Sequence, residues 1–346
     1  MNHPNATPEN IVASQKTVAV IGTGSWGTAL AILIARNGYA VRLWGCEPNE
    51  IKDLKENRRN SRYLGDIKLP EKIIVDDDLS SILNHCNDII IAVPSHAFQS
   101  LLQLIHPLIQ NNNKIRFAWG TKGLDTEHKL LHETAGEIIG NKPMAIVSGP
   151  SFAKEVAEGL PTAVVVAATE KQFAEDLANY LHNETFRVYL SNDLVGVEIC
   201  GAVKNVLAIA IGIAAGMGLG ANSRAALMTR GLAELTRLGL ALGGKQETFM
   251  GLAGIGDLIL TCTDDQSRNR RFGLAIGKGA MAKEAEQNIG QIVEGIANTK
   301  EVYLLAKSKN VEMPIVEQVY KILYENLSPK DALKTLLSRS RKEREF

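Results

Sequence analysis

Three glycines near the start of the chain have the spacing of a dinucleotide-binding turn. They form the G-x-G-x-x-G pattern Gly22-Thr-Gly24-Ser-Trp-Gly27. In such a turn the first glycine allows a tight bend, the second lets a pyrophosphate approach the backbone, and the third lets helix and strand pack closely. A β-branched run (17–21) precedes the pattern and a helix-forming segment (28–37) follows it, so free N–H groups at a helix N-terminus would face the phosphates. We interpret the stretch as a dinucleotide site rather than as a plain strand–helix turn.

The sequence leaves the choice between NAD(H) and NADP(H) open. Glu47 lies 20 residues after Gly27, the spacing of an acid that binds the ribose of NAD, but it falls just beyond the strand predicted at 40–44. Arg42 and the Arg58-Arg59 pair could instead contact the extra phosphate of NADP.

Lys204 lies within an unusually apolar segment, residues 195–210. Burial of a lysine disfavours its charged form and lowers its pKa toward neutrality. Such a lysine suits general acid–base work on a carbonyl or hydroxyl oxygen. The alternative is a lysine that reaches solvent or pairs with Glu198, and the pattern alone does not separate the two.

Three further groups could act beside Lys204. Asp257 follows two glycines and could orient Lys204 or accept a substrate hydroxyl, or it could simply cap a helix. Lys122 follows the strand predicted at 115–119, where ligands bind in parallel sheets, although it could be an ordinary loop lysine. Residues 267–271, Ser-Arg-Asn-Arg-Arg, could hold a phosphate, or they could be a solvated surface.

The elements that must position these residues change character near residue 192. Before it, strands alternate with helices, which predicts a mostly parallel sheet covered on both faces, with ligands beyond strand ends such as Val93, Trp119 and Val147. The predicted strands are 17–21, 40–44, 72–75, 88–93, 115–119, 144–147, 162–167 and 186–190. After it come long helical segments without a convincing strand, at 195–215, 223–242, 298–307, 314–324 and 329–338. We therefore predict a flexible tail (1–16), a Rossmann-like doubly wound dinucleotide-binding domain (17–192) and an all-α substrate and catalytic domain (193–346).

Composition narrows the functional class. Among 346 residues, 38 Lys+Arg balance 38 Asp+Glu, so the zero net charge argues against a general nucleic-acid or anionic-membrane surface. Four scattered cysteines without metal-site spacing and a polar start without a signal-peptide core favour the cytoplasm and predict no metal site. The longest apolar run, 206–221, has 16 residues, fewer than the ~20 that span a bilayer, so we expect a buried helix and no stable membrane insertion.

The ordered set of motifs resembles the NAD(P)-dependent glycerol-3-phosphate dehydrogenases, especially the bacterial form. The segments that carry the resemblance are 22–27, 93–96, 121–124, 148–155, 201–206, 230–234, 254–258, 261–264, 267–271 and 293–295. The resemblance implies interconversion of dihydroxyacetone phosphate and sn-glycerol 3-phosphate by hydride transfer with the nicotinamide, which supplies glycerophospholipid synthesis. It also implies a homodimer. Cys46 departs from the bacterial pattern, which has a basic or imidazole side chain beside the ribose, and this puts a preference for NADPH in doubt.

The resemblance also assigns roles to individual residues. It makes Lys204 the proton donor and acceptor. The implied substrate contacts are Lys122, Gly149, Ser151, Lys204, Asp257, Ser267, Arg268 and Asn269. The implied contacts to NAD(H) or NADP(H) are Gly22, Gly24, Ser25, Trp26, Gly27, Lys122, Ala153, Arg268, Ile292 and Glu294.

The sequence leaves two alternative functions open. One is a related two-domain hydroxyacid or ketopantoate reductase, whose carboxylate substrate would not call for the cluster at 267–271. The other is a non-catalytic nicotinamide sensor, which would not need Lys204 in an apolar helix.

Overall fold

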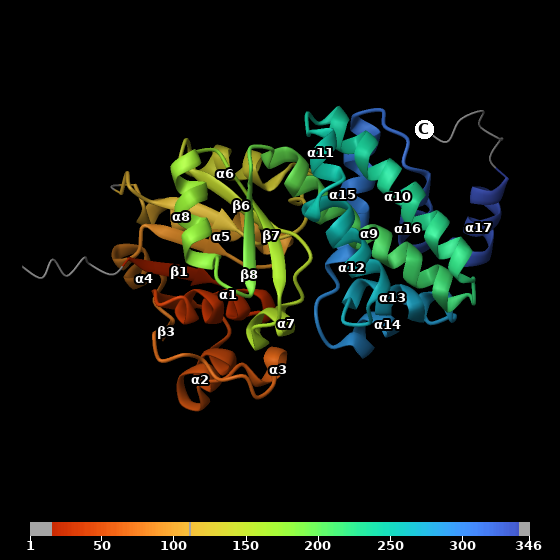
Figure 1. The fold of residues 1–346 in the computed structure, drawn as a ribbon. Helices are drawn as coiled ribbons and strands as arrows, with labels where there is room; N and C mark the ends of the chain where they lie inside the picture. The colour runs from red at the N-terminus through yellow and green to blue at the C-terminus, as the bar shows by residue number, and fades with distance from the viewer. Residues whose placement is uncertain (1–15, 111, 339–346) are drawn as a thin grey trace, which may run out of the picture.

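The computed structural model describes residues 16–110 and 112–338, so the predicted tail lies outside it except for Lys16. Residues 17–191 form an α/β unit, and residues 194–337 form a helical unit beside it (Figure 1). The predicted fold class, a Rossmann-like doubly wound sheet followed by an all-α part, is confirmed.

An eight-stranded sheet with the order β3-β2-β1-β4-β5-β6-β7-β8 organises the first unit. Its strands are β1 (Thr17–Ile21), β2 (Ala40–Trp44), β3 (Ile73–Asp76), β4 (Asp88–Ile91), β5 (Arg116–Trp119), β6 (Met144–Ser148), β7 (Thr162–Ala168) and β8 (Phe186–Ser191). Neighbouring strands are parallel except for β6 and β7, which are antiparallel. The strand order reverses between β1 and β4, where Ile21 pairs with Ile91, so the ligand crevice of this fold opens directly after these strands.

Successive side chains of β1 point to opposite faces of the sheet, and apolar clusters cover both faces. Val18 and Val20 point to one apolar cluster, whereas Ala19 and Ile21 point to another, and all four are fully buried. On the first face lie α1 (Ser25–Arg36), α2 (Pro48–Asn57), α3 (Ser61–Leu64), α7 (Ala153–Glu158) and α8 (Lys171–Leu181). On the second lie α4 (Leu79–His85), α5 (Ser95–Ile105), a 3₁₀ turn (His106–Leu108) and α6 (Leu131–Ile139).

A single buried helix, α9 (Leu194–Gly216), is the axis of the helical unit. Every residue from Gly196 to Ala214 is buried, because α9 packs against other helices and against β6 and β7 of the sheet. The helices that contact α9 are α10 (Ala221–Ala241), α11 (Gln246–Phe249), α12 (Asp257–Thr263), α13 (Arg268–Gly277), α15 (Glu294–Ser308) and α16 (Pro314–Tyr324). Two further helices lie outside this set: α14 (Ala282–Ile289) contacts α13, and α17 (Pro329–Leu337) contacts α16. The length and apolar composition of α9 would also suit a membrane span, but other parts of the protein bury most of it.

Several element boundaries differ from the prediction. The helix predicted at 195–215 is confirmed as α9, and Gly218, with a φ of +80°, follows its end within the apolar run 206–221. The sequence also predicts a helix at 127–139 and a polar loop at 57–66; the helix begins only at Leu131, and the loop contains α3. The helices α7, α11, α12, α13 and α14 were not predicted, because each has at most 10 residues, which is too short for a clear helical period.

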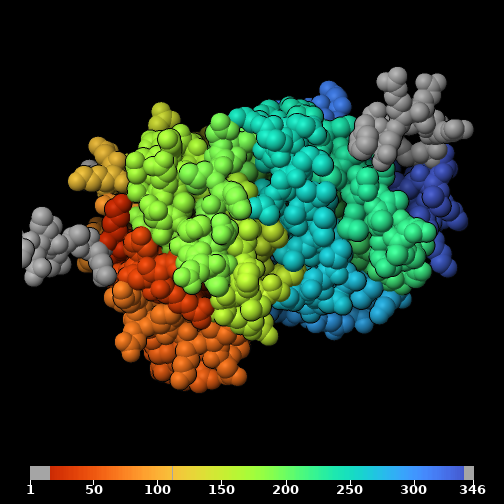
Figure 2. Space-filling model, in the orientation of Figure 1, coloured from red at the N-terminus to blue at the C-terminus, as the bar shows by residue number. Residues whose placement is uncertain are grey.

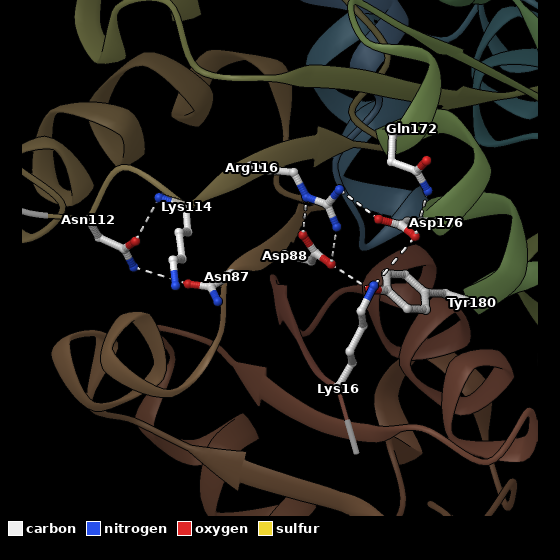
Figure 3. Close-up of polar contacts among 9 residues, drawn as sticks. All are labelled: Lys16, Asn87, Asp88, Asn112, Lys114, Arg116, Gln172, Asp176 and Tyr180. Atoms are coloured by element: carbon white, nitrogen blue, oxygen red, sulfur yellow. Dashed lines mark hydrogen bonds and ion pairs between the residues drawn. The ribbon is translucent and has the colours of Figure 1, made fainter. Parts of the chain in front are cut away.

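A buried polar network ties together the end of the sheet opposite the crevice (Figure 3). Arg116, the first residue of β5, donates two hydrogen bonds to Asp88, at 2.6 and 2.7 Å, and one to Asp176 of α8, at 2.7 Å. The hydroxyl of Tyr180 donates to Asp88 at 2.5 Å, and the Arg116 guanidinium stacks on Phe173. Since these groups lie where the parallel strands begin, they fix the sheet and leave its carboxyl edge to the ligand.

Candidate active site

The glycine-rich turn has the geometry that a dinucleotide requires. Gly22 has a φ of +120°, and a side chain there would press on the carbonyl of Ala92, 2.7 Å from its Cβ. A Cβ at Gly24 would meet nothing within 4 Å among the described residues, so this side of the turn is open to a ligand. Gly24 caps α1 without a side-chain bond, and the first turn of α1 carries no acid. The N–H groups of that turn therefore remain available to an anion, which fits the pyrophosphate of NAD(H) or NADP(H).

Trp26 and the loop after β5 extend this region. The indole Nε1 of Trp26 is buried without a hydrogen-bond partner among the described residues, and it lies against Gly120. Ser25 and Trp26 begin α1. Ala153 begins α7, which packs against α1.

A carboxylate between two lysines lies where the α/β unit and the helical unit meet. Asp257 of α12 accepts from the Nζ of Lys204 in α9 at 2.5 Å and from the Nζ of Lys122, in the loop after β5, at 3.0 Å. Lys204 also donates to the hydroxyl of Thr261 at 3.0 Å, and Lys122 donates to the carbonyl of Gly149 at 3.3 Å. Side chains from both structural units thus meet at a single carboxylate.

Burial sets the charge states of this group. Lys204 is 6% exposed, and desolvation lowers its pKa to about 8, even though Asp257 opposes the shift. Burial alone would raise the pKa of Asp257, but the charges of Lys122 and Lys204 hold it below its ordinary value. An ionised aspartate therefore faces a lysine that can gain or lose a proton near neutral pH.

The alternatives considered for these residues do not hold. Lys204 does not pair with Glu198, which instead accepts from Trp119 at 3.2 Å and contacts His132 at 2.6 Å. Asp257 does not cap a helix, because it is the first residue of α12 and its carboxylate binds the lysines. A π-helical turn, Leu252–Gly256, leads into it. This turn contacts β7. The space-filling view in Figure 2 shows the α/β unit and the helical unit packed against each other.

The residues of the cluster at 267–271 have different partners. Arg268 donates to the carbonyl of Ile292 at 2.9 Å, and Asn269 donates to Asn205 at 2.9 Å. Ser267 caps α13, where its hydroxyl oxygen accepts from the N–H of Arg270. Arg270 forms an ion pair with Asp265, and Arg271 is exposed. Two of the three arginines of the cluster are thus paired or exposed, whereas Arg268 is held at the carbonyl of Ile292.

The remaining predicted residues surround the same space. Gly149 has a φ of +140°, and its carbonyl accepts from Ser151 at 2.9 Å as well as from Lys122. Glu294 begins α15, where burial raises its pKa although Arg268 and both lysines oppose the shift. The side chain of Ile292 is 46% exposed.

Asn205 and Thr261 lie beside Lys204 and were not predicted as site residues from the sequence. Asn205 is 4% exposed; its Oδ1 accepts from Asn269, but its Nδ2 has no partner among the described residues. A buried, unsatisfied donor next to Lys204 is costly unless a ligand completes it. The sequence signal that could have identified Asn205 is its position directly after Lys204, the candidate base.

The arginines considered for an NADP phosphate are engaged elsewhere. Arg42 pairs with Asp76, Arg58 donates to the carbonyls of Ile73 and Pro70, and Arg59 pairs with Asp66. Beyond the end of β2 lies a cavity of about 490 Å³. Its lining includes Trp44, Cys46, Lys52, Lys55 and Asp77.

Comparisons with known proteins agree over nearly the whole described chain. Family models for the N-terminus and the C-terminus of NAD-dependent glycerol-3-phosphate dehydrogenase match residues 17–174 and 193–334. A glycerol-3-phosphate dehydrogenase [NAD(P)+] from Bartonella tribocorum is 53% identical over 335 residues, which are 95% of this chain and 99% of that protein. The crystal structure of glycerol-3-phosphate dehydrogenase from Coxiella burnetii has a TM-score of 0.92 and 51% identity, covering 94% of this chain and 99% of that one.

A ketopantoate reductase from Ralstonia eutropha is similar in fold alone. It has a TM-score of 0.55 and 13% identity, and the match covers 92% of this chain and 99% of that one. The family models and the close relatives, by contrast, agree on one assignment: the chain belongs to the NAD-dependent glycerol-3-phosphate dehydrogenase family.

Proposed function

We propose that the protein interconverts dihydroxyacetone phosphate and sn-glycerol 3-phosphate with NAD(H) or NADP(H), and that Lys204 gives and takes the proton. One observation carries this assignment: a buried lysine with a pKa of about 8 is anchored by a carboxylate in a crevice beside a dinucleotide-type turn. When bound, the nicotinamide supplies or accepts the hydride at the substrate carbon.

The contacts of Lys204 leave a proton for the substrate oxygen. Its ammonium has three N–H bonds, and the contacts to Asp257 and Thr261 use two of them. The third can stabilise the oxygen of the ketone as negative charge develops there, and then protonate it. In the reverse direction the neutral amine accepts the proton of the hydroxyl. Hydrogen bonds to Asp257 and Thr261 hold the Lys204 amine in place in both directions of the reaction.

Donors for the phosphate lie at the start of α13. Arg268 uses one N–H for Ile292 and keeps its others, and Ser267 keeps its O–H because its oxygen only accepts from Arg270. Asn269 is held by Asn205 and by the N–H of Gly295, which accounts for its fixed orientation. Lys122, Gly149, Ser151 and Asp257 complete the proposed substrate contacts, on the other side of Lys204.

The nucleotide part of the proposal uses the first unit. The turn Gly22–Gly27 would hold the pyrophosphate, and Ser25, Trp26, Lys122, Ala153, Arg268, Ile292 and Glu294 would contact the cofactor. The 490 Å³ cavity at Cys46 offers room for the adenosine. Residues 17–192 would thus serve as the nucleotide domain and residues 193–346 as the substrate and catalytic domain.

A homodimer, a cytoplasmic location and a role in glycerophospholipid synthesis belong to the same proposal. The family assignment supports all three. The four cysteines, free of disulfides in the described chain, are consistent with a reducing compartment. Light scattering of the purified protein tests the dimer.

Initial rates of reduced-cofactor oxidation test the reaction directly. Dihydroxyacetone phosphate and ketopantoate would each be offered with NADH and with NADPH. We expect turnover with the phosphorylated ketone alone, and the ratio of the two kcat/KM values gives the cofactor preference. Turnover of ketopantoate but not of dihydroxyacetone phosphate would instead indicate that the protein is a carboxylate reductase.

A further inference from the structure

Asn60 occupies the N-cap of α3, but its side chain does not cap that helix. Asparagine normally accepts a hydrogen bond there from the first helical turn. Here the side chain turns inward, is 5% exposed, and donates from Nδ2 to the carbonyl oxygen of Thr23 at 2.7 Å and to the hydroxyl of Thr28 at 2.8 Å. The Thr28 hydroxyl in turn donates to the same carbonyl at 3.2 Å.

This arrangement fixes one peptide of the glycine-rich turn. The Thr23–Gly24 peptide is planar and trans, so its C=O and its N–H point in opposite directions. Two donors hold the carbonyl inward, which leaves the N–H of Gly24 facing away from them. A Cβ on Gly24 would meet nothing within 4 Å in the part of the chain that the structure describes, so that side of the turn is open there.

A second contact from the same segment holds the turn. The Thr23 hydroxyl donates to Glu50 of α2 at 3.2 Å, and Glu50 also accepts from Arg62 at 2.8 Å. The segment that connects β2 to β3 therefore holds Thr23 by hydrogen bonds to its backbone carbonyl and to its side-chain hydroxyl. Glycine turns are flexible by nature, and such anchors lower the ordering cost of binding.

We propose that Asn60 is a positioning residue for the cofactor pyrophosphate. It acts through the Thr23 carbonyl and presets the Gly24 N–H for the phosphate oxygens. The inference rests on the proposed function only in that the ligand is a dinucleotide.

The test measures binding separately from turnover. Asn60→Ser keeps a good N-cap residue for α3 but is too short to reach Thr23. We expect it to raise the Kd of NADH or NADPH, and of ADP-ribose, by about 5- to 100-fold, the range for one lost hydrogen bond to a buried group. At saturating cofactor, kcat and the KM for dihydroxyacetone phosphate should stay within about twofold of the parent values.

Two further variants separate positioning from folding. Thr28→Val removes the hydroxyl that Asn60 and Thr23 share and should weaken ADP-ribose binding, whereas Thr28→Ser should restore it. Asp78→Ala removes a true cap, which accepts from the N–H of Ser80 in α4, and should lower the melting temperature without changing the Kd. An unchanged Kd in folded Asn60→Ser, or an equal rise in Asp78→Ala, would overturn the proposal. Binding of ADP-ribose by the parent protein without any turnover would instead count against the proposed reaction.

Discussion

Opposing effects at Lys204 set its affinity for a proton. Desolvation lowers its pKa most strongly, the charge of Asp257 raises it, and the charge of Lys122 lowers it again. The result, about 8, lies close to the pH at which the amine must be able to act both as acid and as base. Asp257 is therefore more than an anchor, since its charge limits how far burial depresses the pKa.

The rate should depend on pH with opposite signs in the two directions. Ketone reduction needs the ammonium form, so kcat should be level below about pH 8 and fall above it, whereas alcohol oxidation should rise through the same range. Asp257→Asn removes the countercharge and should move the inflection to lower pH. Profiles of kcat at saturating substrate and cofactor check this, and a flat profile between pH 7 and 9 would count against Lys204.

Arg268 should matter for the phosphate more than for the ketone. Arg268→Ala is expected to raise the KM for dihydroxyacetone phosphate by about 10- to 100-fold, the loss of a charge-assisted contact, with a much smaller effect on unphosphorylated dihydroxyacetone. Arg271→Ala, an exposed arginine of the same helix, is the matched control and should change neither value. Equal effects of Arg268→Ala on both ketones would remove Arg268 from the phosphate site.

At the scale of elements, the contact between α9 and α13 connects the proposed proton donor to the proposed phosphate donors. Glycines allow the two helices to touch: a Cβ on Gly273 would run into the backbone of Ile209, and one on Gly212 into the backbone of Arg270. Lys204 and Asn269 lie on these two helices, so the distance between the helices sets the distance between their functions.

Gly273→Ala should therefore lower stability and raise the KM together. We expect about 1–3 kcal/mol of destabilisation from overpacking, with a larger KM for dihydroxyacetone phosphate. Gly136→Ala in α6 is the control of opposite sign, because its Cβ would meet only Met144, at 4.0 Å, and alanine favours a helix by about 0.5–1 kcal/mol. Denaturant unfolding and steady-state kinetics measure both quantities, and a stabilised Gly273→Ala would contradict the packing argument.

The polar network at the far end of the sheet should affect stability without affecting chemistry. Arg116→Met leaves the buried Asp88 without its cation and should lower the free energy of unfolding by about 3 kcal/mol. Lys129→Met breaks an exposed pair with Glu137 and should change the free energy of unfolding far less, because solvent screens the pair. The kcat of folded Arg116→Met should equal that of the parent protein; a lower kcat would place this network in the catalytic machinery.

At the scale of the whole molecule, the site exists only where the two units meet. Lys122 comes from the sheet, Lys204 and Asp257 come from the helical unit, and Gln266 bonds to Glu155 across the same boundary at 2.7 Å. Among the described residues, neither unit alone contains both the glycine-rich turn and the buried Lys204, so we expect activity to need both units.

The sequence predicted those parts of the fold that have a strong local signal. Continuous apolar runs predicted the strands and α9, and the glycine spacing predicted the turn at Gly22. It could not predict that the Asn60 side chain turns away from its own helix, because a contact with Thr23, 37 residues away, decides its direction. The same reason explains Asp257, whose partners lie 53 and 135 residues away.

The central claim, that Lys204 moves the proton, is tested most directly by Lys204→Met, which fills the buried space without an amine. We predict that the kcat for dihydroxyacetone phosphate reduction falls by about 10²- to 10⁴-fold, while the Kd of the reduced cofactor, measured by fluorescence titration, stays within about threefold. A folded Lys204→Met protein that binds the cofactor and turns over at the parent rate would contradict the account.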